Sequence, residues 1–276
     1  MTAETPQKKF VDVRQLIAGK NPSLLKIIPG FLIRWIKNLI HEEEVNAFFI
    51  EQEKADAFEF CEAAVKRFDL QLHVEGLENI PSEPTPIILA ANHPLGGLDA
   101  ISLIHALRDR RKDLKFIVND FLMAVRNLQD RFIGVNKVGK SAKESLHKVE
   151  EQFANGTATF VFPAGLVSRK TDGMIKDLEW KKTFISKARK YRRPIIPIYF
   201  GGRLTNRFYR LANLRKFLGI RFNIEMMYLV DEMFYQQGMH IDIIIGKPID
   251  PSTLTRDKSD QEWAQWVKEK VYQLKK

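Results

Sequence analysis

The sequence predicts an α/β fold: a mostly parallel central sheet flanked by helices, with an N-terminal amphipathic helical extension. Two observations lead to this class. Before residue 70, apolar residues recur at helical spacing. After residue 70, short apolar runs typical of buried strands alternate with helical patterns, and such alternation forms parallel sheets covered on both faces. We therefore expect residues 1–70 to form a helical, membrane-contacting extension and residues 71–276 to form the main domain.

The bulk composition restricts the partners and the cellular location. Lys and Arg exceed Asp and Glu by 44 − 34 = 10, which suits an anionic partner such as nucleic acid, an anionic bilayer or an acidic carrier protein. No stretch approaches the roughly 18 to 20 uncharged apolar residues that span a bilayer. The single cysteine, Cys61, cannot form an internal disulfide, and the N-terminus lacks the apolar run of a secretory signal. The composition therefore predicts an intracellular protein without a transmembrane helix.

The N-terminal segment carries the pattern expected of a membrane-surface helix. An apolar run to Ile28 ends at a Pro29–Gly30 break, and an apolar stripe with flanking basic residues follows. Aromatic and basic residues of this kind suit the interface of an anionic bilayer. The expected membrane contacts are Phe31, Arg34, Trp35, Ile36 and Lys37. Alternatively, the stripe packs on the next helix, which we expect to run unbroken over residues 44–68, and never touches lipid.

The main domain alternates strands and helices. The expected strands are residues 72–77, 87–91, 115–118, 132–138, 157–162, 194–200, 222–229 and 241–245, and the expected helices include residues 141–154, 178–191 and 260–275. In parallel sheets, chemistry gathers in the loops beyond the carboxyl ends of the strands. Two unusual segments occupy such positions, Asn92–Asp99 and Pro163–Lys170.

The segment Asn92–Asp99 reads NHPLGGLD and carries a candidate general base. His93 directly follows a buried strand, which gives it a rigid support. Gly96 and Gly97 permit positive φ and a close approach of the backbone to a ligand. If the loop folds back, Asp99 at the start of a helix receives the His93 Nδ1–H, so that Nε2 can take a proton from a substrate hydroxyl. The carboxylate then stabilises the imidazolium that forms.

Simpler readings of the same residues stay open at this point. His93 can be an ordinary turn histidine, and Asp99 can merely cap a helix. The interpretation as a metal site has still less support, because no second histidine lies three or four residues away and the sequence has no cysteine cluster. The chain also lacks a G-x-S-x-G nucleophile elbow, and Cys61 lies far from these loops. The attacking group is therefore expected to come from the substrate, which favours direct acyl transfer to an acceptor hydroxyl.

The NHPLGGLD segment resembles the NH-x4-D block of the glycerolipid acyltransferases, the family that includes 1-acylglycerol-3-phosphate acyltransferase. Here the aspartate follows the histidine after five residues instead of four, a change that a glycine-containing loop can absorb. The form NHPxG…D is similar to the branch of ornithine-lipid and other amino-acid-lipid O-acyltransferases, often labelled hemolysin-like. The resemblance implies that His93 and Asp99 are catalytic and that Asn92, Gly96 and Gly97 bind substrate.

The segment from Phe162 to Lys170 resembles the FPEGTRS block of the same family, whose Glu and Arg help bind a glycerol phosphate. Ala164 stands where that Glu would be, and the first positive charge is Arg169, two residues late. Phosphate favours a guanidinium in fixed bidentate geometry. The departure therefore favours an acceptor headgroup without phosphate, such as an N-acylated amino acid whose carboxylate pairs with Arg169. Alternatively, Arg169 and Lys170 are a solvated loop face.

Further blocks occur in the order of the family, and the resemblance covers residues 72–249. Residues 194–198 (PIIPI) resemble its apolar VPV block, and residues 132–138 lie where it has an acceptor-binding block, which implies roles for Asn136 and Lys137. Together with the second block, the implied substrate-binding residues are Asn136, Lys137, Phe162, Pro163, Ala164, Gly165, Ser168 and Arg169.

The resemblance implies an O-acyltransferase that uses acyl-ACP or acyl-CoA as donor, with no bound cofactor or metal. Its implied partners are membrane lipids and the acyl carrier protein, and its implied location is the inner face of the cytoplasmic membrane. One alternative keeps the reaction and takes lysophosphatidic acid or another lysophospholipid as acceptor. Another is nucleic-acid binding, prompted by the basic stretch 203–221, although helix-turn-helix, zinc-finger and RNP-like motifs are absent. That stretch could also bind headgroups or the carrier protein, or be a solvated face.

Overall fold

The computed structural model describes residues 9–20, 22–135, 141–220 and 222–275. The chain divides into two compact units. The sheet unit comprises Asp56–Leu204 and Gln236–Lys276, and the helical unit comprises Met1–Ala55 and Thr205–Tyr235. The units do not follow the expected boundary at residue 70, because the helix that ends at Arg67 belongs to the sheet unit.

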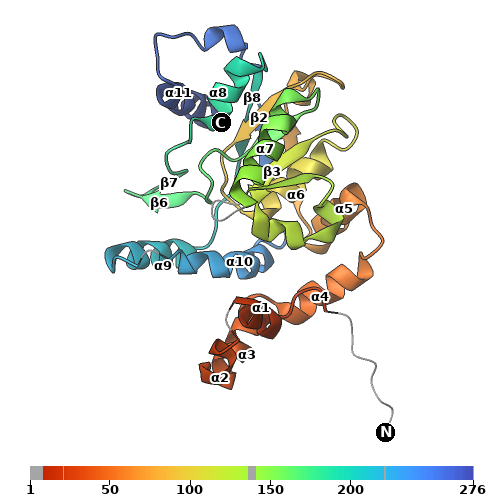
Figure 1. The fold of residues 1–276 in the computed structure, drawn as a ribbon, viewed down its shortest axis with the longest axis vertical. Helices are drawn as coiled ribbons and strands as arrows, with labels where there is room; N and C mark the ends of the chain where they lie inside the picture. Colours follow the sequence, from red (N-terminus) through yellow and green to blue (C-terminus); the bar gives the residue numbers. More distant parts are fainter. Residues whose placement is uncertain (1–8, 21, 136–140, 221, 276) are drawn as a thin grey trace. The chain divides into compact units, whose positions relative to one another are not determined.

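A seven-stranded sheet forms the centre of the sheet unit, and Figure 1 labels three of its strands, β8, β2 and β3. The strand order is β1-β9-β8-β2-β5-β3-β4. The strands are β1 Gln71–Glu75, β2 Ile88–Ala91, β3 Lys115–Asn119, β4 Phe132–Val135, β5 Thr159–Val161, β8 Ile195–Phe200 and β9 His240–Ile245. The five strands from β8 to β4 are parallel to one another, β9 is antiparallel to β8, and β1 is parallel to β9. This confirms the predicted α/β class with a mostly parallel sheet.

β2 lies between β8 and β5, and its residues are apolar because both faces of the sheet are covered. All four of its side chains are buried, in contrast to the alternation of a half-exposed strand. The register aligns Ala90 with Val161 and Ala91 with Ile198. The carboxyl ends of β2, β5 and β8 therefore meet at one edge of the sheet, and the loops that follow them are neighbours.

The helices of the sheet unit pack on this core. They are α5 Ala57–Arg67, α6 Gly97–Ala106, α7 Ser141–Ala154, α8 Thr183–Lys190 and α11 Asp260–Gln273, with a short hairpin of β6 Arg169–Thr171 and β7 Met174–Lys176. α11 begins at a capping box of Ser259 and Glu262 and buries Trp263 and Val267 in the core. Although its sequence is mostly polar, α11 therefore has one apolar face that packs on the core.

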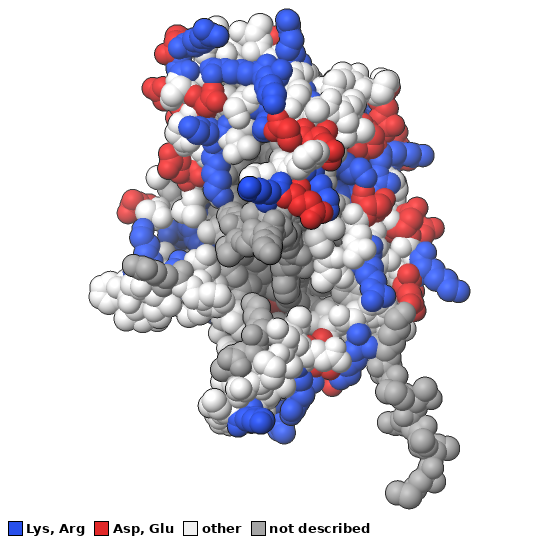
Figure 2. Space-filling view, in the orientation of Figure 1, with Lys and Arg blue, Asp and Glu red and all other residues white. Residues whose placement is uncertain are grey.

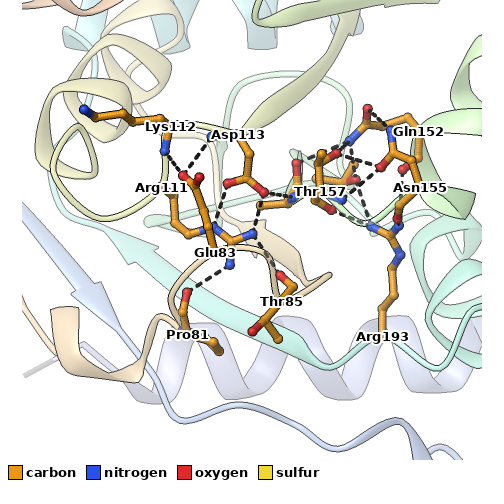
Figure 3. Close-up of polar contacts among 12 residues, drawn as sticks. Pro81, Glu83, Thr85, Arg111, Lys112, Asp113, Gln152, Asn155, Thr157 and Arg193 are labelled. Atoms are coloured by element: carbon orange, nitrogen blue, oxygen red, sulfur yellow. Dashed lines mark hydrogen bonds and ion pairs between the residues drawn. The ribbon is translucent and has the colours of Figure 1, made fainter.

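Two buried arginines brace the opposite edge of the sheet (Figure 3). Arg111 donates from Nη2 to Asp113 Oδ2 at 2.7 Å and to the Thr85 carbonyl at 2.8 Å. Arg193 donates to the Thr157 carbonyl at 2.8 Å. These residues immediately precede β2, β3, β5 and β8, so they lie at the amino ends of the strands. Both guanidinium groups are hydrogen-bonded to the loops at this edge, so we assign the two arginines a structural role. The carboxyl ends of the strands, at the opposite edge, are the expected place for an active site.

The helix expected over residues 44–68 is wrong as a single element. The structure has α4 Glu42–Glu51 and α5 Ala57–Arg67, separated by a break. Asp56 ends the break, because its carboxylate accepts the N–H groups of Phe58 and Glu59 at 2.8 and 2.9 Å, and the Glu59 carboxylate accepts the Asp56 N–H at 2.9 Å. This capping box starts a new helix. The D-x-x-E spacing that forms it is visible in the sequence.

The strand expected over residues 222–229 is also wrong. Residues Ile224–Tyr228 form a 3₁₀ helix (η4) that runs into α10, Leu229–Tyr235. Glu225 on η4 is buried and pairs with Arg215 Nε at 2.8 Å, which holds this segment against α9, Asn206–Phe217. The place beside β8 in the sheet is taken by β9 instead.

The helical unit combines the N-terminal helices with α9, η4 and α10. Its first helices are α1 Val13–Lys20, α2 Leu24–Ile27, α3 Gly30–Leu39 and α4, and the predicted break at Pro29–Gly30 separates α2 from α3. The Trp35 ring meets the Tyr228 ring edge-on, and His41 Nε2 lies 2.9 Å from Asp231 Oδ1. Among the described residues, no helix is both long and apolar enough to cross a bilayer.

Candidate active site

His93 and Asp99 meet in the loop that leaves β2. His93 Nδ1 lies 2.9 Å from Asp99 Oδ2, so the predicted contact is present despite the extra residue between them. Oδ2 also accepts the Leu95 backbone N–H at 2.9 Å, which fixes this oxygen as an acceptor and Nδ1 as the protonated ring nitrogen. No partner among the described residues contacts Nε2, so it can accept a proton from a bound hydroxyl.

The environment of Asp99 differs from that of His93. Asp99 is fully buried at the start of α6, whereas the His93 side chain keeps 18% of its surface exposed. Burial raises the pKa of Asp99, and the hydrogen bond from His93 offsets only part of that rise. Within the described part of the chain, Asp99 Oδ1 has no hydrogen-bond partner. A positive charge developing on His93 would therefore be stabilised by a carboxylate that water does not solvate.

The imidazole of His93 is held flat against the ring of Phe162. The two ring centroids lie 3.8 Å apart with an interplanar angle of 19°. Phe162 directly follows β5, the strand beside β2, so the second loop supports the base of the first. The carboxylate fixes one edge of the imidazole and the phenyl ring fixes one face, which leaves Nε2 as the free edge.

Two other His–Asp pairs in this chain lack these properties. His73 Nδ1 lies 3.1 Å from Asp242 Oδ1, but both side chains are more than half exposed. His41 has carboxylates near both ring nitrogens, with Asp231 at Nε2 and Glu44 3.6 Å from Nδ1. A base needs one oriented nitrogen and one free nitrogen in a sheltered place. Of these pairs, His93 and Asp99 alone meet that requirement.

A buried carboxylate couples the two loops. Asp177 Oδ1 accepts the His93 backbone N–H at 3.1 Å and the Ser168 hydroxyl at 2.6 Å, while its Oδ2 accepts the Trp180 indole N–H at 2.8 Å. The Ser168 N–H also donates to the His93 carbonyl at 2.8 Å. On α11, the Tyr272 hydroxyl accepts the Asp177 backbone N–H at 2.7 Å. Asp177 is therefore a positioning residue for the backbone of His93.

We expect Asp177→Asn to lower kcat while KM for both substrates changes little. The amide nitrogen cannot accept, so at least one of the three donors to Asp177 loses its partner, at a cost of about 1–3 kcal/mol in stability. Asp177 holds the His93 backbone and does not touch a substrate in the proposed reaction, so the loss is expected in kcat and not in KM. Thermal unfolding and steady-state rates measure the effects on stability and on turnover. A Glu179→Gln variant at an exposed neighbour is the control, and a change confined to KM in Asp177→Asn would contradict the positioning role.

One glycine in each loop has a backbone conformation that side chains disfavour. Gly96 has φ 71° just before α6, and Gly165 has φ 70° in a turn closed by its N–H on the Phe162 carbonyl at 2.9 Å. A Cβ on Gly165 would also lie 2.7 Å from the ammonium of Lys181. Lys181 therefore lies directly over the turn that follows Phe162. Gly97, in contrast, begins α6 in an ordinary helical turn.

The remaining predicted substrate-binding residues fall into three groups. Asn92 is buried, and its side-chain amide donates to the Phe200 carbonyl at 2.8 Å and accepts the Phe200 N–H at 2.7 Å. Pro163, Ala164, Ser168 and Arg169 are buried, and Arg169 Nη1 donates to the Val167 carbonyl at 2.7 Å. The reading of Arg169 as a solvated loop residue is therefore wrong. Asn136 and Lys137 lie outside the described residues.

The predicted membrane contacts lie on α3 in the helical unit. Phe31 and Trp35 are exposed by 73% and 46%, and Arg34 is exposed as well. Ile36 is half-buried, and Lys37 pairs with Glu42 at 2.7 Å. The buried side of the helix consists of Ile33 and Leu39. The stripe thus packs along one edge and presents its largest aromatic side chains to the surroundings.

Sequence reasoning missed Asp177, Trp180, Lys268 and Tyr272. Lys268 Nζ donates to the Asp177 and Leu178 carbonyls at 2.7 and 3.0 Å and so continues the same network. No motif surrounds these residues in the sequence, and Tyr272 lies 95 residues from Asp177. In the described part of the chain, no group of three or more His, Cys, Asp or Glu side chains gathers as a metal site would.

Comparison with known proteins gives concordant matches. A family model described as "Acyltransferase" matches residues 15–276. A lyso-glycine lipid O-acyltransferase from Bacteroides thetaiotaomicron is 41% identical over 96% of this chain and 97% of its own length, and one from Phocaeicola vulgatus is 38% identical over 96% and 95%. The crystal structure of the 1-acyl-sn-glycerophosphate acyltransferase PlsC from Thermotoga maritima shares the fold, with a TM-score of 0.51, 21% identity, and coverage of 95% of this chain and 93% of that one.

Proposed function

The chain belongs to the acyltransferase family, and from this premise we propose that it moves a fatty acyl group from a thioester to a hydroxyl of a lyso-lipid acceptor, with His93 as general base. The observation that carries the proposal is the sheltered His93–Asp99 pair with a free Nε2 at the carboxyl edge of the sheet. The related lyso-glycine lipid O-acyltransferases, aligned over nearly the whole chain, support the acceptor class.

The reaction needs only proton transfer and positioning from the protein. Nε2 of His93 takes the proton of the acceptor hydroxyl as its oxygen attacks the thioester carbonyl. The buried Asp99 stabilises the imidazolium, which then returns the proton to the departing thiol sulfur as the tetrahedral intermediate collapses. The C–O bond of the new ester forms and the C–S bond breaks, so no redox partner is required. The donor is acyl carrier protein or coenzyme A carrying the acyl chain.

We place the acceptor headgroup at the turn after Phe162 and give it a carboxylate in preference to a phosphate. Ala164 removes the acidic residue that the family uses near a glycerol phosphate, and the Arg169 guanidinium is buried against the Val167 carbonyl. The exposed Lys181 ammonium lies over Gly165 and is a single point charge, which suits a carboxylate. An N-acylated amino acid, as in a lyso-glycine lipid, has this headgroup.

The acceptor is insoluble, so we further propose that the enzyme works as a peripheral protein on the inner face of the cytoplasmic membrane. The exposed Phe31, Arg34 and Trp35 on α3 support this location, because aromatic and cationic side chains favour the lipid interface. Lys37 is already paired with Glu42 and contributes less to headgroup binding.

An acceptor comparison tests the proposal. With labelled acyl carrier protein as donor, we expect wild type to acylate an N-acyl amino-acid lipid far faster than lysophosphatidic acid. Lys181→Gln is expected to raise KM for the amino-acid lipid by roughly tenfold, the effect of losing one charge-assisted hydrogen bond. Lys182→Gln, at the exposed neighbouring position, is the control. Labelling of lysophosphatidic acid alone would contradict the headgroup assignment but not the assignment of His93 as general base.

A further inference from the structure

The end of α9 and the turn after it expose an unusual amount of apolar surface. Five large side chains within nine residues are exposed: Leu214 by 54%, Phe217 by 86%, Leu218 by 58%, Ile220 by 40% and Phe222 by 66%. In Figure 2 the free end of α9 is drawn mostly white, which marks an uncharged surface. Contiguous exposed apolar surface of this kind marks a binding site. We call residues 214–220 together with Phe222 the α9 tip.

The α9 tip is anchored at its base. Thr205 caps α9 and donates its hydroxyl and its N–H to the Glu232 carboxylate, each at 2.6 Å. Phe208 and Tyr209 on the first half of the helix are buried. The first half of α9 is therefore packed against the helical unit, and only its last residues expose apolar side chains.

The turn at the α9 tip has a defined conformation. Gly219, at φ 68°, and Ile220 donate their N–H groups to the Lys216 and Arg215 carbonyls, both at 3.1 Å. Arg215 holds the turn from beneath, because Nη1 donates to the Ile220 carbonyl at 2.7 Å and Nε pairs with the buried Glu225. The apolar side chains therefore project from a closed turn, which lowers the entropy cost of inserting them elsewhere.

The charge around the α9 tip is mainly positive, although Arg207 and Arg215 pair with Asp231 and Glu225 of the same unit. Residues 203–223 contain six Lys or Arg and no Asp or Glu. Arg210 and Lys216 are exposed on α9 itself, beside the apolar residues. A bilayer with anionic headgroups complements this combination, because it offers an apolar interior below a negative surface. A soluble acidic protein would complement the charge alone.

We propose that the α9 tip inserts into the headgroup region of an anionic bilayer, as a second membrane contact besides α3. Phe217 and Phe222 enter the acyl boundary, and Arg210 and Lys216 lie at the headgroup phosphates. The α9 tip belongs to the same compact unit as α3, so both contacts are carried by the helical unit. The inference rests on the peripheral membrane location proposed above and adds the surface that binds.

Vesicle co-sedimentation of the full chain tests the proposal. We expect Phe217→Ser/Phe222→Ser to reduce binding to phosphatidylglycerol-containing vesicles at least tenfold, and Lys216→Gln/Arg210→Gln to reduce it on these vesicles but not on phosphatidylcholine vesicles. Leu146→Ser is the matched control, because Leu146 is 63% exposed on α7 in the sheet unit. All substituted side chains are exposed, so the melting temperature should stay unchanged, which would show that the variants are folded.

Activity with a short-chain, water-soluble acceptor separates this inference from the proposed reaction. The double phenylalanine variant should keep wild-type turnover of that acceptor while losing turnover on vesicles. Vesicle binding needs no turnover, so it decides the inference even if the proposed reaction fails. Wild-type vesicle binding by the double variant would overturn the proposal, and so would a wild-type dimer in solution that the variant abolishes, because the tip would then bind a second copy.

Discussion

Replacing His93 by alanine should reduce kcat by roughly 10²- to 10⁴-fold or more, the contribution expected of a positioned general base. The acceptor hydroxyl would have to lose its proton to water, because Nε2 of His93 is the free, oriented base of the site. KM for both substrates should change little, since the imidazole holds the reacting proton and not the acyl chain or the headgroup. Initial rates with labelled acyl carrier protein measure the loss.

Folding must be checked in the same experiment, because the substitution leaves Asp99 buried without its partner and removes the ring that stacks on Phe162. His73→Ala is the matched control: its imidazole also contacts an aspartate, Asp242, but at the surface. We expect His73→Ala to keep full activity. An active, folded His93→Ala protein would exclude the proposed mechanism.

Asp99→Asn should have the second-largest effect, a loss in kcat of roughly 10²- to 10⁴-fold, as removal of the carboxylate has in His–Asp systems of other enzymes. The asparagine amide can donate to Nδ1, which favours the tautomer with the proton on Nε2. That nitrogen then cannot accept the proton of the acceptor hydroxyl. Because Asp99 Oδ2 contacts both Nδ1 and the Leu95 N–H, an amide nitrogen in its place leaves the Leu95 N–H without an acceptor, so thermal unfolding must be measured together with the rate.

The same variant should lower activity but gain stability relative to the wild type as pH rises. Burial raises the pKa of Asp99 in the folded protein, so between about pH 4, its ordinary value, and the raised value the folded state holds more protons than the unfolded state. Asp99 therefore makes the wild type less stable as pH rises through this window. Asp99→Asn removes that slope, and its melting temperature relative to wild type should rise as the pH increases from about 4 into the range of the raised pKa.

The control for this pair of effects is Asp242→Asn, which alters an exposed carboxylate that also contacts a histidine. It should change neither the rate nor the pH slope of stability. Wild-type kcat in Asp99→Asn would mean that the carboxylate serves only as a helix residue, which is the simpler reading of the sequence. An unchanged slope with pH would instead contradict the raised pKa.

Some failures of sequence reasoning have local causes and others do not. The break at Asp56 could have been found, because its capping box with Glu59 is written in four consecutive residues. Residues 222–229 could not, because their apolar pattern suits a strand as well as a helix, and the buried Glu225–Arg215 pair decides between them. Asp177 could not be found either, since His93, whose backbone N–H it accepts, lies 84 residues away in the sequence.

The sequence by itself determined the class of fold and the places where chemistry could occur. Apolar runs such as Ile88–Ala91 and Thr159–Val161 are local signals of buried parallel strands, and the loops after them stand out by their residue types. Only the tertiary structure decided which histidine has a free, sheltered nitrogen. It also decided that Phe162 and Asp177 fix His93. Burial and contact between distant segments arise from packing, and no local pattern encodes them.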